Sequence, residues 1–140
     1  MVLVLKAGAS NNSGSASAVS VRDIHKSFGS LEVLKGISMD AAKGDVISII
    51  GASGSGKSTF LRCINLLELP SKGSISIAGE GITFKPGKDG NLLPTNPKQV
   101  QRLRTKLGMV FQNFNLWQHM NVLQNVIEAP VQVLGISKAE

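Results

Sequence analysis

The stretch Val46-Ile-Ser-Ile-Ile-Gly-Ala-Ser-Gly-Ser-Gly-Lys-Ser-Thr59 decides the fold. Its opening run, Val46–Ile50, is apolar with little alternation, which is typical of a strand covered on both faces inside a parallel sheet. The glycines that follow predict a tight turn. A strand, a glycine-rich turn and then a helix, in this order, indicate an α/β fold.

The turn at Gly51–Thr59 also matches Gly-x4-Gly-Lys-[Ser/Thr], the pattern of a phosphate-binding loop (P-loop). Its glycines let successive backbone N–H groups point at phosphate oxygens, and the helix start adds the positive end of its dipole. Lys57 is expected to reach the β- and γ-phosphates of a nucleoside triphosphate, and the Ser58 hydroxyl to bind Mg²⁺. The predicted nucleotide-binding residues of the loop are Gly51, Ala52, Ser53, Gly54, Ser55, Gly56, Lys57, Ser58 and Thr59.

The helix after this loop is expected to begin at about Lys57 and to be ended by Pro70. Its predicted apolar face consists of Phe60, Leu61, Ile64 and Leu67. Cys63 falls among these apolar neighbours and is expected to be a buried structural thiol. A single cysteine cannot form an internal disulfide, which fits a reducing compartment.

Alternating apolar residues predict antiparallel strands beginning at Val19, over Leu31–Ala42, and over Ser74–Ala78. Gly79–Pro97 is rich in Gly, Pro, Lys and Asn and is expected to be a long exposed loop. Residues 1–18 are predicted to be a flexible tail, because the segment is rich in small and polar residues.

A basic amphipathic helix is predicted over residues 97–106, with Val100, Leu103 and Leu107 on its buried side. A strand is expected at Leu107–Phe111.

A further helix is expected near Asn121, because Asn121 and Gln124 have capping-box spacing. Pro130 should kink or break that helix, and Gly135 should end it. Its predicted buried face is formed by Val122, Leu123, Val126 and Ile127.

The chain has 140 residues, 42% of them apolar, and a net charge of +6. This is enough apolar material for the core of one domain. The cations are spread along the chain and there are six Phe and Trp residues with no Tyr, so nucleic acid is not an expected partner. No apolar run approaches the roughly 20 residues that a membrane span needs.

Three blocks of the sequence resemble the ATP-binding subunits of bacterial ABC importers for polar amino acids. They are Gly44–Asn65, with the P-loop; Met109-Val-Phe-Gln-Asn-Phe-Asn-Leu-Trp117; and Asn121-Val-Leu-Gln-Asn-Val-Ile-Glu-Ala-Pro130. The histidine/lysine/arginine/ornithine permease type is the most similar. The resemblance implies a P-loop NTPase core with a parallel sheet, flanking helices and an N-terminal antiparallel β subdomain.

The resemblance also assigns roles to residues outside the P-loop. Phe28, in Lys26-Ser-Phe-Gly29, matches the aromatic residue that stacks on adenine in such proteins. Gln112 matches the Q-loop glutamine, a catalytic residue that approaches Mg²⁺ and the attacking water. Residues 113–128 resemble the surface that receives the transmembrane partner. The implied cofactors are ATP and Mg²⁺.

By this resemblance the protein would couple ATP hydrolysis to uptake of a polar, basic amino acid. It would lie at the cytoplasmic face of the bacterial inner membrane as a dimer of ATPase subunits on two transmembrane permease subunits. A periplasmic solute-binding protein would be an indirect partner. The ATPase subunit does not contact the transported molecule, so the sequence does not name it.

The motifs that follow the Q-loop in this family are not found up to Glu140: the Walker B aspartate, the catalytic glutamate, the signature motif and the switch histidine. Ser137–Glu140 has the spacing of a capping box, which predicts the start of another helix. We therefore expect residues 19–140 to be the N-terminal portion of a longer ATP-binding domain, which alone binds but does not hydrolyse ATP.

Two alternatives stay open from the residues themselves. One is a short nucleotide-binding module that docks on the permease without hydrolysis. The other is a different P-loop enzyme, such as a nucleotide or small-molecule kinase, against which the Q-loop block argues.

Overall fold

The computed structural model describes residues 3–7, 17–113 and 115–137. The chain divides into two compact units, Met1–Gly108 and Met109–Glu140. Among the described residues, the first unit contains all the strands together with helices α1 and α2, and the second contains helix α3.

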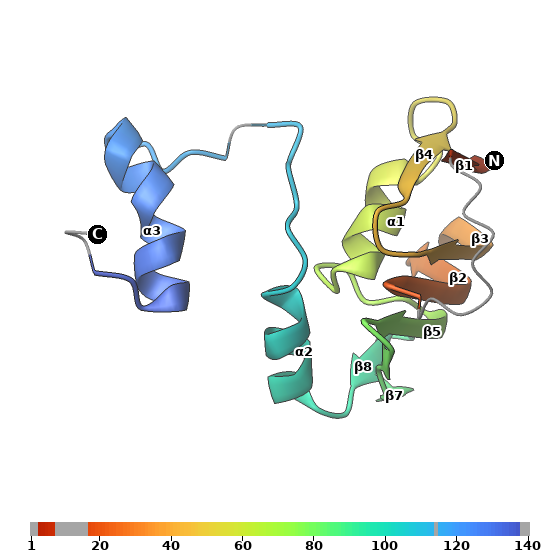
Figure 1. Cartoon of the computed structure of the whole chain (residues 1–140). Coiled ribbons are helices and arrows are strands. Elements are labelled where there is room, and N and C mark those ends of the chain that lie inside the picture. Colours follow the sequence, from red (N-terminus) through yellow and green to blue (C-terminus); the bar gives the residue numbers. More distant parts are fainter. Residues whose placement is uncertain (1–2, 8–16, 114, 138–140) are drawn as a thin grey trace. The chain divides into compact units, whose positions relative to one another are not determined.

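A four-stranded antiparallel sheet organises the first unit, with the strand order β3-β2-β5-β6; Figure 1 labels its members β3, β2 and β5. Its members are β2 (Val19–Phe28), β3 (Leu31–Ala41), β5 (Lys72–Ile77) and β6 (Glu80–Gly81). The three antiparallel strands predicted from alternation are confirmed as β2, β3 and β5. Each carries apolar residues on the face that the helices cover; these alternate in β5, whereas in β2 and β3 register shifts change the spacing.

The β2–β3 pairing contains a bulge beside the P-loop. Lys26 is opposite Leu34, whereas the next residue, Ser27, is opposite Glu32. Val33 is therefore an extra residue in β3 without a cross-strand partner in this register. Bulges redirect side chains and often lie next to functional sites.

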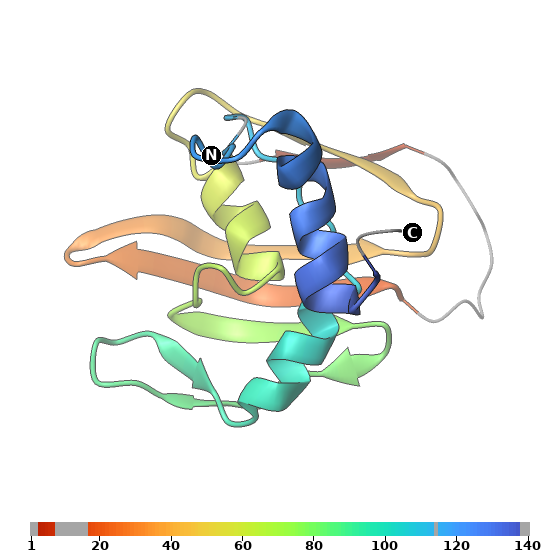
Figure 2. The same ribbon diagram turned by 90° about the vertical axis from the view of Figure 1, so that its left-hand side faces the viewer.

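Helices α1 (Lys57–Ile64) and α2 (Pro97–Arg104) lie on the same face of this sheet (Figures 1 and 2). Asn96 caps α2, and its side chain accepts a hydrogen bond from the Gln99 N–H at 3.1 Å. The sheet and both helices share one apolar core. Its buried residues are Val21, Ile24, Leu34, Phe60, Cys63, Leu66, Ile75, Ile77, Ile82, Val100 and Leu103.

The predicted helix 97–106 is confirmed, with Val100 and Leu103 buried as expected. The prediction for α1 was partly wrong. Its start at Lys57 and the burial of Phe60 are confirmed, but it ends at Ile64, before Pro70. Leu67 thus lies beyond the helix and is 50% exposed, because Leu66 turns into a left-handed conformation (φ 60°) after the C-cap.

The parallel sheet expected around β4 (Val46–Ile50) is not formed among the described strands, whose pairings are all antiparallel. β4 instead pairs with β1 (Leu3–Ala7), in the register Leu3 opposite Ile50. The predicted tail over 1–18 is therefore wrong at Leu3–Ala7, where an unpaired strand edge accepts an extended segment. Val46 and Ile50 remain 67% and 53% exposed, so β4 is not covered on both faces.

The predicted loop Gly79–Pro97 contains more structure than expected. Besides β6, it forms a hairpin of β7 (Phe84–Pro86) and β8 (Leu92–Pro94). Ile82 within this region is buried in the core. The polar composition of this segment predicted a loop, although its backbone forms strand pairs.

The strand predicted at Leu107–Phe111 is absent from the structure, where these residues have no regular secondary structure. Val110 is 98% exposed. A strand needs a neighbour for its backbone groups, and no described strand pairs with this segment.

The second unit contains α3 (Val122–Leu134), which has the predicted capping box between Asn121 and Gln124. Gly135 ends it in a left-handed conformation, also as predicted. The helix continues through Pro130 without a break; the N–H that proline lacks would have bonded the carbonyl of Val126, an exposed residue where water can replace it.

The predicted buried face of α3 is wrong for the described residues. Val122, Leu123 and Val126 are exposed, and Ile127 is half-buried. The unit itself supplies no described element against which this face could pack. The helix start predicted at Ser137–Glu140 lies outside the described residues from position 138 onward.

Within the described part of the chain, no helix has the length and apolar character needed to cross a membrane.

Candidate functional site

The P-loop joins β4 to α1 through a turn in which two glycines have left-handed backbone conformations, which residues with a Cβ atom rarely adopt. Gly54 has φ +75° and Gly56 has φ +97°. Gly56 is the N-cap of α1, and its carbonyl accepts a hydrogen bond from the Phe60 N–H at 2.8 Å. The first N–H groups of α1 have no partner inside the helix, so this end suits an anion.

Gly56 is also required by close packing against β3. A Cβ atom at this position would lie 2.9 Å from Cδ2 of Leu34 and 3.0 Å from Cγ1 of Val33. At Gly54 a Cβ atom would meet nothing within 4 Å. The left-handed backbone therefore favours glycine at both positions, whereas lack of space for a Cβ atom excludes other residues at Gly56 alone.

A cavity of about 270 Å³ opens at this turn. Its lining consists of the bulged residue Val33 together with Gly54, Ser55, Gly56, Lys57, Ser58 and Thr59. These residues contribute glycine backbone, hydroxyl groups and one ammonium group, and no carboxylate. This set of donors at a helix N-terminus fits a polyphosphate.

Two polar groups at the cavity have contacts that a phosphate could change. Within the described structure, the hydroxyl of Ser55 is buried and has no hydrogen-bond partner. Lys57 Nζ donates to the carbonyl oxygens of Gly51 and Ala52, at 2.8 and 2.9 Å. A bound phosphate would accept from Lys57 in place of these carbonyls, and charge-assisted bonds are the stronger kind.

For Mg²⁺, the residues present fit an ion held mainly by the nucleotide. Ser58 is exposed in the first turn of α1 and lines the cavity, so its hydroxyl could supply one ligand. Mg²⁺ usually keeps several waters and takes further oxygens from phosphates, so one hydroxyl is a suitable contribution from the loop.

Phe28 lies at the end of β2 and is 46% exposed. Its ring has the Nζ atom of Lys26 at 4.7 Å from the centroid. Its cross-strand partner Leu31 precedes the cavity-lining Val33 by two residues on β3. The aromatic ring thus lies at the end of β2, next to the strand β3 that borders the P-loop.

Neither Lys26 nor Val33 was predicted from the sequence. Strict alternation from Val19 and Val21 would place Lys26 on the outward face of β2, but the register shift between Val21 and Ile24 turns it inward. A lysine at such a position indicates a specific partner. Val33 depends on the bulge, which no local pattern predicts.

Gln112 lies in the second unit, at a bend, and is exposed. Residues 113–128 belong to the same unit, and most of the described residues from 113 to 126 are exposed. The roles of Gln112 in catalysis and metal binding, and of this segment in docking, stay predictions.

Two other titratable groups lie outside the P-loop cavity. Cys63 is fully buried, as predicted, and this burial raises the pKa of its thiol to about 11. His25 contacts Glu32 at 2.9 Å and Asp23 at 3.1 Å. The hydrogen bond with Glu32, followed by that with Asp23, raises the pKa of His25 above 6.5.

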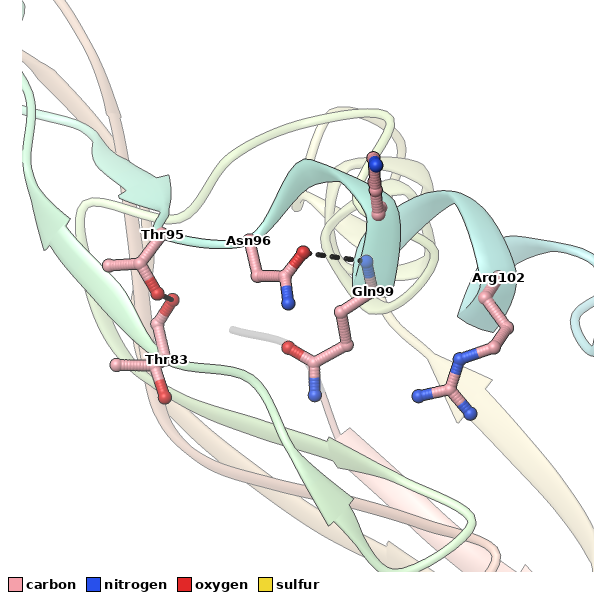
Figure 3. Close-up of a pocket in the computed structure, with 6 residues that line it drawn as sticks. Thr83, Thr95, Asn96, Gln99 and Arg102 are labelled. Atoms are coloured by element: carbon pink, nitrogen blue, oxygen red, sulfur yellow. Dashed lines mark hydrogen bonds between the residues drawn. The ribbon is translucent and has the colours of Figure 1, made fainter.

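A second cavity, of about 480 Å³, lies at the start of α2 (Figure 3). Its labelled residues include Thr83, Thr95 and Gln99, with the guanidinium of Arg102 at one side. Arg102 already pairs with Glu80, which compensates its charge. The P-loop cavity is therefore the better candidate for a triphosphate.

Comparison with known proteins agrees with the resemblance seen in the sequence. The family model described as "ABC transporter" matches residues 34–139. An arginine/ornithine transport ATP-binding protein of Pseudomonas aeruginosa is 63% identical over 86% of this chain and 47% of its own length. A histidine/lysine/arginine/ornithine transport ATP-binding protein of Escherichia coli is 60% identical over 90% of this chain and 49% of its own.

One further relative and one solved structure are also similar to this chain. A nopaline permease ATP-binding protein of Agrobacterium fabrum is 58% identical over 84% of this chain and 46% of its own. Among solved structures, CbiO1 of Clostridium perfringens, part of the ABC transporter complex CbiONQ, matches with a TM-score of 0.61 and 25% identity, over 84% of this chain and 43% of that one. The expected fold class is thus confirmed. The chain spans about half the length of the relatives it matches.

Proposed function

This chain belongs to the ABC transporter family, and we therefore propose that it binds ATP as the N-terminal part of an ATP-binding subunit of a bacterial importer. The transported class would be a polar, basic amino acid, because relatives of 63% and 60% identity are ATP-binding proteins of arginine/ornithine and histidine/lysine/arginine/ornithine transport. The observation that carries the proposal is the P-loop cavity, with Lys57 at the start of α1.

The roles of the P-loop residues follow from their chemistry. Lys57 leaves the carbonyls of Gly51 and Ala52 and binds the β- and γ-phosphates. The backbone of the loop and the Ser55 hydroxyl donate to phosphate oxygens. Ser58 contributes a ligand to the Mg²⁺ ion, which neutralises phosphate charge and supplies the Lewis acid for hydrolysis.

The base is proposed to stack on Phe28, whose ring is partly exposed on the strand next to β3. Gln112 is proposed to approach the metal ion and the attacking water, as its match to the Q-loop implies. It would link nucleotide state to the transmembrane permease subunits through residues 113–128.

The remaining assignments are those of the family. A second ATPase subunit would complete the nucleotide site, and a periplasmic solute-binding protein would deliver the amino acid without contacting this chain. The protein would lie peripherally at the cytoplasmic face of the inner membrane.

We further propose that the 140-residue chain alone binds Mg-ATP weakly and does not turn it over. The P-loop cavity has no carboxylate among its lining residues that could position a water for attack. A phosphate-release assay with the purified chain tests this: release that Lys57→Ala abolishes would contradict it.

The transport role is tested in the bacterium that carries this chain. Replacing its gene by a Lys57→Ala version should abolish uptake of radiolabelled arginine, ornithine, lysine or histidine through this system. Uptake of leucine serves as the control and should not change. Unchanged uptake of all four basic amino acids would contradict the proposed substrate class.

The alternative, a non-hydrolysing module that docks on the permease, predicts another result. The Lys57→Ala strain would then keep uptake, and a 14.8 kDa species would purify together with the membrane subunits. A kinase would instead transfer the γ-phosphate to an acceptor, which a labelled-phosphate assay would detect.

A further inference from the structure

Lys26 is a buried cation whose neighbours hold it firmly. Only 3% of its surface is exposed, on the inward side of β2. Its Nζ atom donates to the carbonyl oxygen of Leu69 at 2.8 Å and to Oδ1 of Asn91 at 3.0 Å, and lies 3.5 Å from a carboxylate oxygen of Glu68. A buried ammonium is costly unless such partners surround it, and an apolar side chain of similar length would avoid this cost. The charge therefore needs an explanation.

The charge lies against the ring of Phe28. The distance of 4.7 Å from Nζ to the ring centroid is within the range of a cation–π contact. Because Lys26 is itself buried, the part of the ring that it covers is closed to solvent. Phe28 as a whole is nevertheless 46% exposed, so the residue remains accessible to a ligand.

We infer that Lys26 is a positioning residue for the nucleotide base: it holds the Phe28 ring with one face outward, and the adenine of ATP stacks on that face. This inference rests on the proposed function, since it assumes that the triphosphate lies at the P-loop. Leu31, opposite Phe28, is two residues from the cavity-lining Val33, which corresponds to about 7 Å along a strand. A ribose joins base and phosphates over a comparable length.

A second element contributes to the position of Lys26. Asn91, between β7 and β8, accepts from Lys26 through Oδ1, which also accepts from the Ser71 hydroxyl at 3.2 Å. The Asn91 side-chain amide donates to Asp89 at 2.8 Å. The hairpin β7–β8 thus takes part in orienting the base-stacking ring, although it contributes no residue to the P-loop cavity.

The test compares two ligands by calorimetry on the full 140-residue chain: Mg-ATP, which has a base, and Mg-tripolyphosphate, which has none. The variants are Lys26→Met, Phe28→Leu and the two combined, with Lys35→Met on the exposed side of β3 as a control for lost charge. Circular dichroism checks that each variant folds.

Lys26→Met should weaken ATP binding about fivefold, which corresponds to a cation–π contact of about 1 kcal/mol, and leave the tripolyphosphate affinity unchanged. In the Phe28→Leu background the same change should weaken ATP binding by less than about twofold, because the ring that Lys26 holds is gone. Lys35→Met should bind both ligands like the original chain. If Lys26→Met does not fold, Asn91→Ala should show a smaller loss, for ATP alone.

Other outcomes would overturn the inference in distinguishable ways. An equal loss of affinity for both ligands, or an undiminished effect of Lys26→Met without Phe28, would reduce Lys26 to a structural role. Unchanged ATP affinity in Phe28→Leu would refute base stacking itself. Failure of the original chain to bind either ligand would refute the proposed function as well.

Discussion

The different constraints on the two glycines of the P-loop predict a difference in stability between Gly56→Ala and Gly54→Ala. Both residues have left-handed backbone conformations, with φ +97° and +75°. This conformation costs a residue with a Cβ atom about 1–2 kcal/mol. Part of that cost, about 0.4–1 kcal/mol, is offset because alanine also restricts the unfolded chain. Gly54→Ala, whose Cβ meets open space, should therefore lose about 0.5–1 kcal/mol.

Gly56→Ala has a further cost from packing. Its Cβ atom would lie 2.9 Å from Leu34 Cδ2, 3.0 Å from Val33 Cγ1 and 3.2 Å from the Val33 carbonyl oxygen. Since the backbone oxygen and the buried Leu34 cannot move freely, overpacking should add about 1–3 kcal/mol. The expected total destabilisation is about 2–4 kcal/mol.

Urea unfolding followed by circular dichroism measures this difference. With a denaturant dependence of about 1–3 kcal/mol per molar urea, Gly56→Ala should lower the midpoint by about 0.7 M or more. Gly54→Ala is the matched control and should lower it by clearly less. Equal midpoints for the two variants would refute the close approach of the P-loop to β3.

Three further predictions concern groups outside the P-loop. Cys63, whose burial raises its pKa to about 11, should resist alkylation at pH 8 in the folded chain and react in urea; rapid reaction without urea would show that α1 does not bury it. The pKa of His25 should lie above 6.5 in an NMR titration and move back toward 6.5 in Glu32→Gln. The contribution of His25 to the free energy of unfolding should therefore be complete below pH 6.5 and be lost as the pH rises through the folded pKa. An unchanged titration in Glu32→Gln would contradict this. Arg104→Met should destabilise the first unit by about 1 kcal/mol or more, because Arg104 donates to the carbonyls of Asn65 and Leu66 at the end of α1. Arg102→Met, on the same helix, should have little effect on the urea midpoint, because the ion pair of Arg102 is exposed. Equal effects of the two substitutions would argue against the contact of Arg104 with α1.

The features that the sequence predicted well are those with local signals. The start of α1 follows from the P-loop, and the capping box at Asn121 and Gln124 from four consecutive residues. The strands β2 and β3 follow from alternation. Each of these depends on contacts within a few positions along the chain, so the pattern alone contains the information.

The features that the sequence did not predict depend on partners far along the chain. The exposure of Val110 and of the apolar side of α3 could not be predicted, because burial requires a neighbouring element that a periodic pattern assumes but does not identify. The pairing of β1 with β4 likewise depends on which strand edge is unoccupied.

In the candidate site, too, the features with local signals were predicted and those that depend on distant partners were not. Gly54, Gly56, Lys57 and Ser58 of the P-loop were predicted from spacing and line one cavity, whereas the predicted Gly51, Ala52 and Ser53 are not among its lining residues. The wall formed by Val33 depends on a one-residue shift in the β2–β3 register. The contact of Lys26 with Asn91 joins residues 65 positions apart, which no local pattern specifies.

Binding of Mg-ATP to the 140-residue chain, measured by calorimetry with Lys57→Ala beside it, tests the central claim most directly. Removing the charge-assisted contact of Lys57 should cost roughly 1.5–3 kcal/mol, so the affinity should fall about tenfold or more. Lys43→Ala, at an exposed turn, is the matched control and should bind like the original chain. The expected result is a loss of affinity confined to Lys57→Ala. Equal affinity of all three proteins, or no binding by the original chain, would contradict the assignment of the P-loop as an ATP site.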